Sequence, residues 1–166
     1  MSLPALLALA LATACARAPG VSTTLTNDDA LVRARDMHSR FITIDTHDDI
    51  PFNFATPEVD PLNADRQVNL EKMKAGGLDA GFFIVFVGQT PRTPENYEKA
   101  KADARTKFDA IHRMTRMYPE RVLLAMSPAD VTRAKREGKL AAAIGIENGY
   151  VIGKELRLIE EYHTLG

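Results

Sequence analysis

The sequence contains a single cysteine, no excess of basic residues and no glycine-rich motif of the kind that binds phosphate groups. Because Cys15 is the only cysteine, no disulfide can form within the chain. The 21 basic and 22 acidic residues give a formal net charge of −1 without a basic stripe, which argues against a nucleic-acid partner. No serine or cysteine stands in a nucleophile motif such as Gly-x-Ser-x-Gly, so the sequence does not indicate covalent catalysis.

The N-terminal region has the pattern of an export signal. Its apolar run over residues 3–14 is too short to cross a bilayer, but it has the length of the apolar core of a secretory signal. Small residues and then Arg17 follow the run, whereas the basic residues that normally precede such a core are missing. We therefore expect residues 1–20 to be a signal peptide or lipoprotein signal, and residues 21–34 to be a tether and the start of the first helix.

The lone cysteine is a candidate for lipid attachment. Cys15 follows Ala12-Thr13-Ala14, which is similar to a bacterial lipobox in which Ala12 replaces the preferred leucine. The alternative is simple cleavage after Ala14 or Ala16. We favour attachment at Cys15, because a lone cysteine at the end of an export signal has few other uses. The expected location is the periplasm, or the membrane surface as an anchored lipoprotein.

The rest of the chain has the composition of one soluble globular domain. Hydrophobic residues make up 45% and charged residues 26% of the 166 residues, and we place the domain at residues 35–166. Continuous apolar runs at 80–87 and 140–146 are typical of strands buried on both faces of a parallel sheet. The alternation of strand and helix is compatible with a doubly wound sheet or a TIM barrel. Strands are predicted at 41–45, 80–87, 122–126 and 140–146, and helices at 28–39, 69–76, 94–118, 127–138 and 154–163.

The first candidate site follows a short apolar strand. Three aspartates and His47 lie within residues 45–49, directly after that strand. Successive side chains on a strand point to opposite faces, so His47 and Asp49 are expected to share a face. Imidazole and carboxylate are both zinc ligands, and closely packed like charges repel unless solvent or a cation relieves them. The motif is compatible with a divalent metal site or, alternatively, with a solvated strand end before Pro51.

A second acidic signal follows the last predicted strand. Glu147 comes directly after the apolar run 140–146, in the same position relative to its strand as the His47–Asp49 pair. In parallel barrels the carboxyl ends of the strands form the active face, so these side chains are expected to converge. The alternative is that Glu147 only caps the turn at Asn148-Gly149. The remaining histidines are expected to be structural, and they are His38, His112 and His163.

Taken together, these motifs resemble the membrane (renal-type) dipeptidases, peptidase family M19. The resemblance extends over about residues 35–166, and Thr46 and Asp48 stand where many members carry glycine and asparagine. It implies an α/β fold, the N-terminal half of a (β/α)8 TIM-type barrel with about four strand–helix units. The segments that carry it are Asp45–Pro51, Gln67–Leu70, Met73–Gly77, Ala80–Phe83 and Gly145–Gly149.

The resemblance also implies a metal-dependent function. The family binds two zinc ions; by resemblance His47 and Asp49 would bind one of them and Glu147 would bridge both. The implied activity is zinc-dependent hydrolysis of dipeptides by a metal-bridging hydroxide. Asp45 and Asp48 are the candidates for orienting the His47 ring. A dipeptide substrate, and a membrane reached through a lipid at Cys15, are the expected partners.

The family's remaining zinc ligands, two histidines and an aspartate, come from later strands and have no counterpart in this sequence. We therefore expect a truncated barrel with little or no activity of its own, which could belong to a homo-oligomer or another assembly. Two alternatives stay open. One is a non-catalytic, exported barrel remnant. The other is a different metal-dependent amidohydrolase, although those enzymes usually carry His-x-His where this chain has Asp49.

Overall fold

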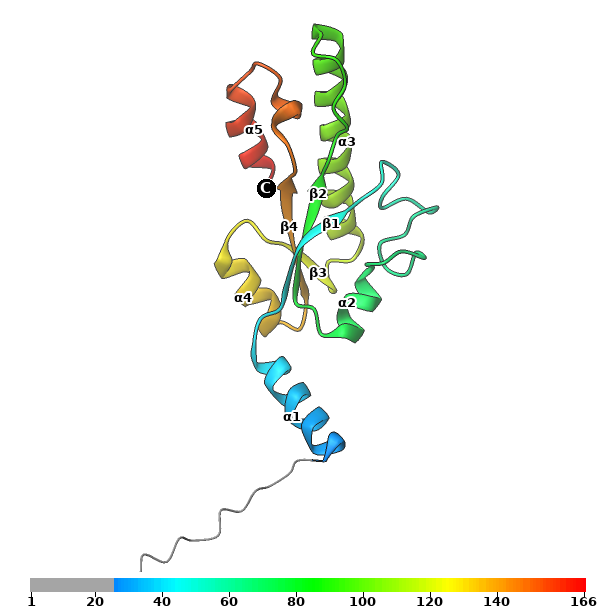
Figure 1. The fold of residues 1–166 in the computed structure, drawn as a ribbon, viewed down its shortest axis with the longest axis vertical. Helices are drawn as coiled ribbons and strands as arrows, with labels where there is room; N and C mark the ends of the chain where they lie inside the picture. The colour runs from blue at the N-terminus through cyan, green and yellow to red at the C-terminus, as the bar shows by residue number, and fades with distance from the viewer. Residues whose placement is uncertain (1–25) are drawn as a thin grey trace, which may run out of the picture.

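The computed structural model describes residues 26–166, so the predicted export signal and the lipidation candidate Cys15 lie outside the described residues. Helices and parallel strands alternate along the described part (Figure 1). The elements are α1 (Asn27–Arg40), β1 (Ile44–Asp49), α2 (Leu70–Gly76), β2 (Ala80–Val85), α3 (Pro94–Met117), β3 (Val122–Leu124), α4 (Pro128–Arg136), β4 (Leu140–Ile146), the 3-10 helix η1 (Gly149–Ile152) and α5 (Arg157–Leu165).

The four strands form one parallel sheet in the order β1-β2-β4-β3. The strand β2 pairs along its whole length with Ala141–Ile146 of β4, whereas the three-residue β3 pairs only with Leu140–Ala142 at the start of β4. If the strands followed one another in the sheet in sequence order, β3 would lie between β2 and β4. This order brings the carboxyl end of β4 next to that of β2, one strand away from β1, and so brings Glu147 close to the His47–Asp49 pair.

The predicted boundaries of the first strand are wrong. The strand begins at Ile44 and continues through Asp49, so the acidic cluster belongs to the sheet and does not follow it. Thr43, just before the strand, is bound to the start of β2 and the residue before it: its N–H donates to Asp79 Oδ2 at 3.0 Å, and its carbonyl accepts from the backbone N–H of Ala80 at 3.0 Å. The register of β1 against β2 shifts between Asp45 and Asp48, as at a β-bulge.

The main core lies between the sheet and α3, the longest helix, which runs beside the strands in Figure 1. Phe108, Ile111 and Met114 on α3 are fully buried, since their spacing keeps them on one helix face. The helix begins at the predicted place, where the Thr93 side chain caps it and Pro94 occupies the first turn. By contrast, α1 buries none of its side chains and projects from the end of the sheet (Figure 1).

Candidate metal centre

Three potential ligands from two strands meet at the carboxyl end of the sheet. His47 Nε2 lies 3.7 Å from Asp49 Oδ1 and 3.5 Å from Glu147 Oε2. One ligand atom from each residue lies within 4.8 Å of the other two. All three residues are exposed, so the group is accessible from solvent.

The sheet register explains why these side chains converge. Asp49 pairs with Ile84, and Ile84 pairs with Gly145, so the three residues share one face of the sheet. Glu147 follows Gly145 by two positions, just beyond the end of β4, and therefore continues on the same face. The face of the sheet opposite α3 thus carries the carboxylates, while α3 supports the strands from behind.

The donor set fits a divalent cation. Zinc binds imidazole nitrogen and carboxylate oxygen at about 2.0–2.2 Å, so two ligands of a tetrahedral ion lie ~3.4 Å apart. The His47–Glu147 and His47–Asp49 separations of 3.5 and 3.7 Å are close to that spacing. Three protein ligands with a side open to solvent is also the arrangement of catalytic zinc sites. The assignment of His47, Asp49 and Glu147 as metal ligands stays a prediction.

The two other aspartates of the cluster make different contacts. Asp45 Oδ1 accepts a hydrogen bond from the backbone N–H of His47 at 2.9 Å. Asp48 is buried, only 7% exposed, and its Oδ1 lies 3.5 Å from Arg66 Nη2. Within residues 26–166 neither carboxylate bonds to the His47 ring, and their predicted role in orienting that ring stays a prediction.

The environment of Asp48 disfavours its charged form. Burial raises the pKa of its carboxyl group from 3.8 to about 6, although the nearby Arg66 guanidinium lowers it. Its Oδ2 atom and the Nε atom of Arg66 are buried without a hydrogen-bond partner. An ionised Asp48 therefore reduces the stability of the fold.

We predict that Asp48→Asn stabilises the metal-free chain above pH 6. A carboxyl group with a raised folded-state pKa contributes most stability below pH 3.8, and this contribution is lost as the pH rises through about 6. This rise in the pKa of Asp48 corresponds to about 3 kcal/mol in the free energy of unfolding. The contact with Arg66 that Asp48→Asn weakens offsets part of that gain. We expect a gain of about 1–3 kcal/mol at pH 7.5, measured by urea unfolding with a chelator present. At pH 4 the two proteins should be equally stable; a gain that does not depend on pH would contradict this account.

Two basic residues that the sequence reasoning missed hold the end of β1. Arg66, in the loop before α2, donates to the carbonyl of Asp49 and lies over the Phe54 ring. Lys107 Nζ on α3 donates to the next carbonyl, that of Ile50, at 2.7 Å. Lys107 is four residues before Ile111 on the buried face of α3, so its spacing in the sequence could have identified it as a buried lysine. No such pattern points to Arg66, because it lies in an irregular loop.

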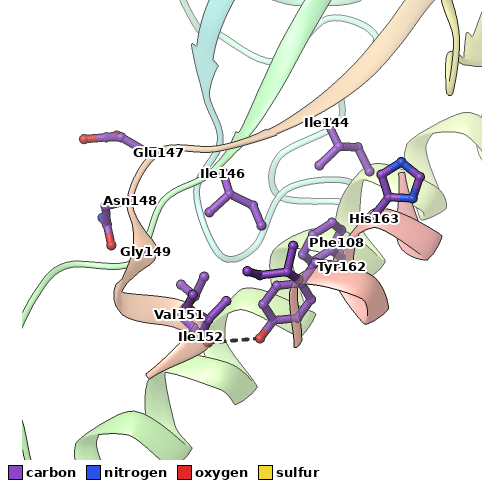
Figure 2. Close-up of a pocket in the computed structure, with 11 residues that line it drawn as sticks. Phe108, Ile144, Ile146, Glu147, Asn148, Gly149, Val151, Ile152, Tyr162 and His163 are labelled. Atoms are coloured by element: carbon purple, nitrogen blue, oxygen red, sulfur yellow. Dashed lines mark hydrogen bonds between the residues drawn. The ribbon is translucent and has the colours of Figure 1, made fainter. Parts of the chain in front are cut away.

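A pocket of about 410 Å³ lies beside Glu147, between the end of β4, η1 and α5. Figure 2 shows that its walls are mostly apolar and that Glu147 points away from them at the rim. Tyr162 Oη donates to the carbonyl of Val151 at 3.1 Å and ties α5 to η1. The lining includes Phe108, Ile144, Ile146, Val151, Tyr162 and His163.

The other histidines lie away from the three potential ligands. The Nε2 atoms of His38 and His112 contact the carbonyls of Gly77 and Leu165, at 3.0 and 2.7 Å. His163 lines the pocket of Figure 2 from α5. In the part of the chain that the structure describes, no helix is long and apolar enough to span a membrane.

The chain is similar to known dipeptidases in sequence and in fold. The protein "Dipeptidase ataJ" of Aspergillus terreus is 28% identical over 158 residues, which cover 88% of this chain and 38% of that protein. The crystal structure of the probable dipeptidase PvdM from Pseudomonas aeruginosa has a TM-score of 0.77 at 24% identity, and the match covers 85% of this chain and 36% of PvdM. A metallopeptidase from Rhodobacter sphaeroides, liganded with a phosphinate mimic of the dipeptide L-Ala-D-Ala, has a TM-score of 0.62 at 21% identity, with 76% and 43% covered.

These likenesses settle the fold and the family. The parallel sheet and its similarity to the dipeptidase structures confirm the predicted fold class, part of a TIM-type barrel. The chain spans about two-fifths of the length of the relatives it matches, at 38% of the Aspergillus terreus protein. The sequence model described as "Membrane dipeptidase (Peptidase family M19)" matches residues 31–166. The chain therefore belongs to the membrane dipeptidase family, peptidase family M19.

Proposed function

We propose that His47, Asp49 and Glu147 bind zinc in a metallopeptidase that hydrolyses dipeptides. The observation that carries the proposal is the convergence of one imidazole and two carboxylates within 4.8 Å at the carboxyl ends of parallel strands. Membership of a metallopeptidase family and the dipeptidase relatives support dipeptide hydrolysis in general. The dipeptide mimic on the Rhodobacter sphaeroides enzyme supports a dipeptide as the substrate class.

Each ligand has a distinct part in this proposal. The His47 Nε2 atom faces both carboxylates, so it would bind the cation between them. Glu147 is exposed and its carboxylate has two oxygens, which would allow one side chain to bind two cations. When bound, zinc would polarise the scissile carbonyl and lower the pKa of a water molecule. A second zinc bridged by Glu147 is part of the proposal by family resemblance.

The proposed setting of the protein follows from the sequence. We propose export to the periplasm, or to the membrane surface as a lipoprotein anchored at Cys15, because residues 3–14 have the pattern of a signal core. We also propose that copies of the chain associate. This is supported by exposed apolar side chains on the ligand-bearing face of the sheet, where Ile44 is 47% and Phe82 37% exposed.

Zinc titration of the 166-residue chain tests the proposed metal site. We expect zinc to bind, measured by competition with a fluorescent chelator and by elemental analysis, and Asp49→Asn to weaken binding. Hydrolysis of Gly-Leu measured alongside is expected to be slow or undetectable, because the family's further zinc ligands have no counterpart among these 166 residues. A chain that binds no zinc would contradict the metal site and favour the non-catalytic alternative.

A further inference from the structure

Lys107 is a buried cation at the back of the ligand-bearing strand. It lies on α3 and is only 4% exposed, and its Nζ donates to the carbonyl of Ile50 at 2.7 Å. The same ammonium group lies 5.0 Å from the centre of the Phe52 ring and 5.9 Å from that of Phe86. The ammonium group thus binds one carbonyl and lies near two aromatic rings.

This environment is unlike that of the other buried lysine on the same helix. Lys101 forms ion pairs with Glu98 and Glu155. Lys107 forms no ion pair within residues 26–166, and burial lowers the pKa of its ammonium group. A buried ammonium without a paired carboxylate costs stability. The carboxylates of Asp49 and Glu147 are the negative charges that most strongly favour its charged form.

The carbonyl that Lys107 binds lies where the sheet stops holding β1. The last register pair of this strand is Asp49 with Ile84, and Pro51, which follows Ile50, has no N–H to continue the ladder. The strand is also irregular between Asp45 and Asp48. The Ile50 carbonyl is bound by a side chain, since Lys107 donates a buried hydrogen bond to it one residue after a potential ligand.

We propose that Lys107 is a positioning residue that fixes the end of β1, so that the side chains of His47 and Asp49 face Glu147. The inference rests on the proposed metal site. It adds that Lys107, on the α3 side of the sheet, supports the strand that carries two of the potential ligands. Lys107 forms no hydrogen bond or ion pair with the three potential ligands, so it would act through the Ile50 backbone to which it donates.

The two roles that a buried lysine could have here predict opposite effects on metal affinity. If Lys107 acted only through its charge, its removal would strengthen cation binding, because a positive charge near the site repels a cation. If it positions the strand, its removal should weaken binding, as losing a residue that orients metal ligands typically costs 10–100-fold in affinity (about 10-fold or more here). The sign of the change therefore distinguishes the two.

The test compares Lys107→Met with Lys101→Met in the full chain. Both substitutions remove a buried lysine from α3 and keep a similar apolar stem, so Lys101→Met controls for loss of a buried lysine. Hydrogen exchange of peptides that cover residues 44–52 is measured by mass spectrometry without metal, and zinc affinity is then measured by chelator competition. We expect Lys107→Met alone to speed exchange in this segment and to lower zinc affinity about 10-fold or more. Lys107→Arg, which keeps a charged donor, should recover most of both.

Each outcome decides the proposal. Unchanged exchange in residues 44–52, or zinc affinity that is equal or higher in Lys107→Met, would overturn it. A wild-type chain that binds no zinc would overturn the proposed metal site, while the exchange measurement would still report whether Lys107 holds the strand. If Lys107→Met does not fold, Lys107→Gln serves instead; its shorter amide falls short of the Ile50 carbonyl and should have the same effects in the same direction.

Discussion

Replacing Glu147 with glutamine is expected to lower the zinc affinity of the chain by about 100-fold or more. The Glu147 carboxylate lies 3.5 Å from His47 Nε2 and is the one potential ligand that β4 brings to the site. A neutral amide keeps the size of the side chain but offers one oxygen and no charge, so it cannot balance a cation or bridge two of them. Mutating a residue that only orients the metal ligands typically lowers metal affinity about 10–100-fold. Mutating a ligand itself should lower the affinity at least as much, by about 100-fold.

Chelator competition on the 166-residue chain measures this effect, and Glu160→Gln is the matched control. Glu160 is an exposed residue on α5 and is not one of the three potential ligands, so the same change there should leave zinc affinity unaltered. Under the proposed function, Glu147→Gln should also abolish any dipeptide hydrolysis, because hydrolysis would depend on the same metal. Zinc affinity within twofold of the wild type would remove Glu147 from the site.

Phe108→Ala is expected to destabilise the fold by about 3–5 kcal/mol. Phe108 is 1% exposed, and its ring stacks on Tyr162 with the ring centres 5.3 Å apart. It joins α3 to α5 and lines the pocket next to Glu147 in Figure 2. Because the side chain is surrounded by packed neighbours, its truncation loses apolar burial and leaves a cavity.

Urea unfolding of the metal-free chain measures this loss. Phe41→Ala is the control, because Phe41 is 62% exposed and its truncation should change the free energy of unfolding by no more than about 0.5 kcal/mol. If Phe108→Ala lowered the free energy of unfolding by as little as the control, the interface between α3 and α5 would contribute little to the stability of the described part.

Much of the fold could be predicted because its signals are local. The long helix beginning at Thr93-Pro94 and the apolar strand 140–146 depend on capping residues and hydrophobic spacing, which act within a few neighbours. The first strand was misplaced for the opposite reason. Its residues Asp45–Asp49 have a polar composition, and they become a strand because they pair with β2, which is far away in the sequence.

The sequence by itself determined the alternation of strands and helices and the candidate residues of the site. His47 and Asp49 stand two apart, and Glu147 directly follows an apolar strand, so local pattern was enough to name all three as candidates. Only the tertiary structure decided the strand order β1-β2-β4-β3, which brings those strand ends together. It alone showed that Asp48 is buried and that Lys107 reaches the Ile50 carbonyl. The physical reason is that burial and long-range hydrogen bonds depend on which segments pack together, whereas caps and periodicity depend on neighbouring residues.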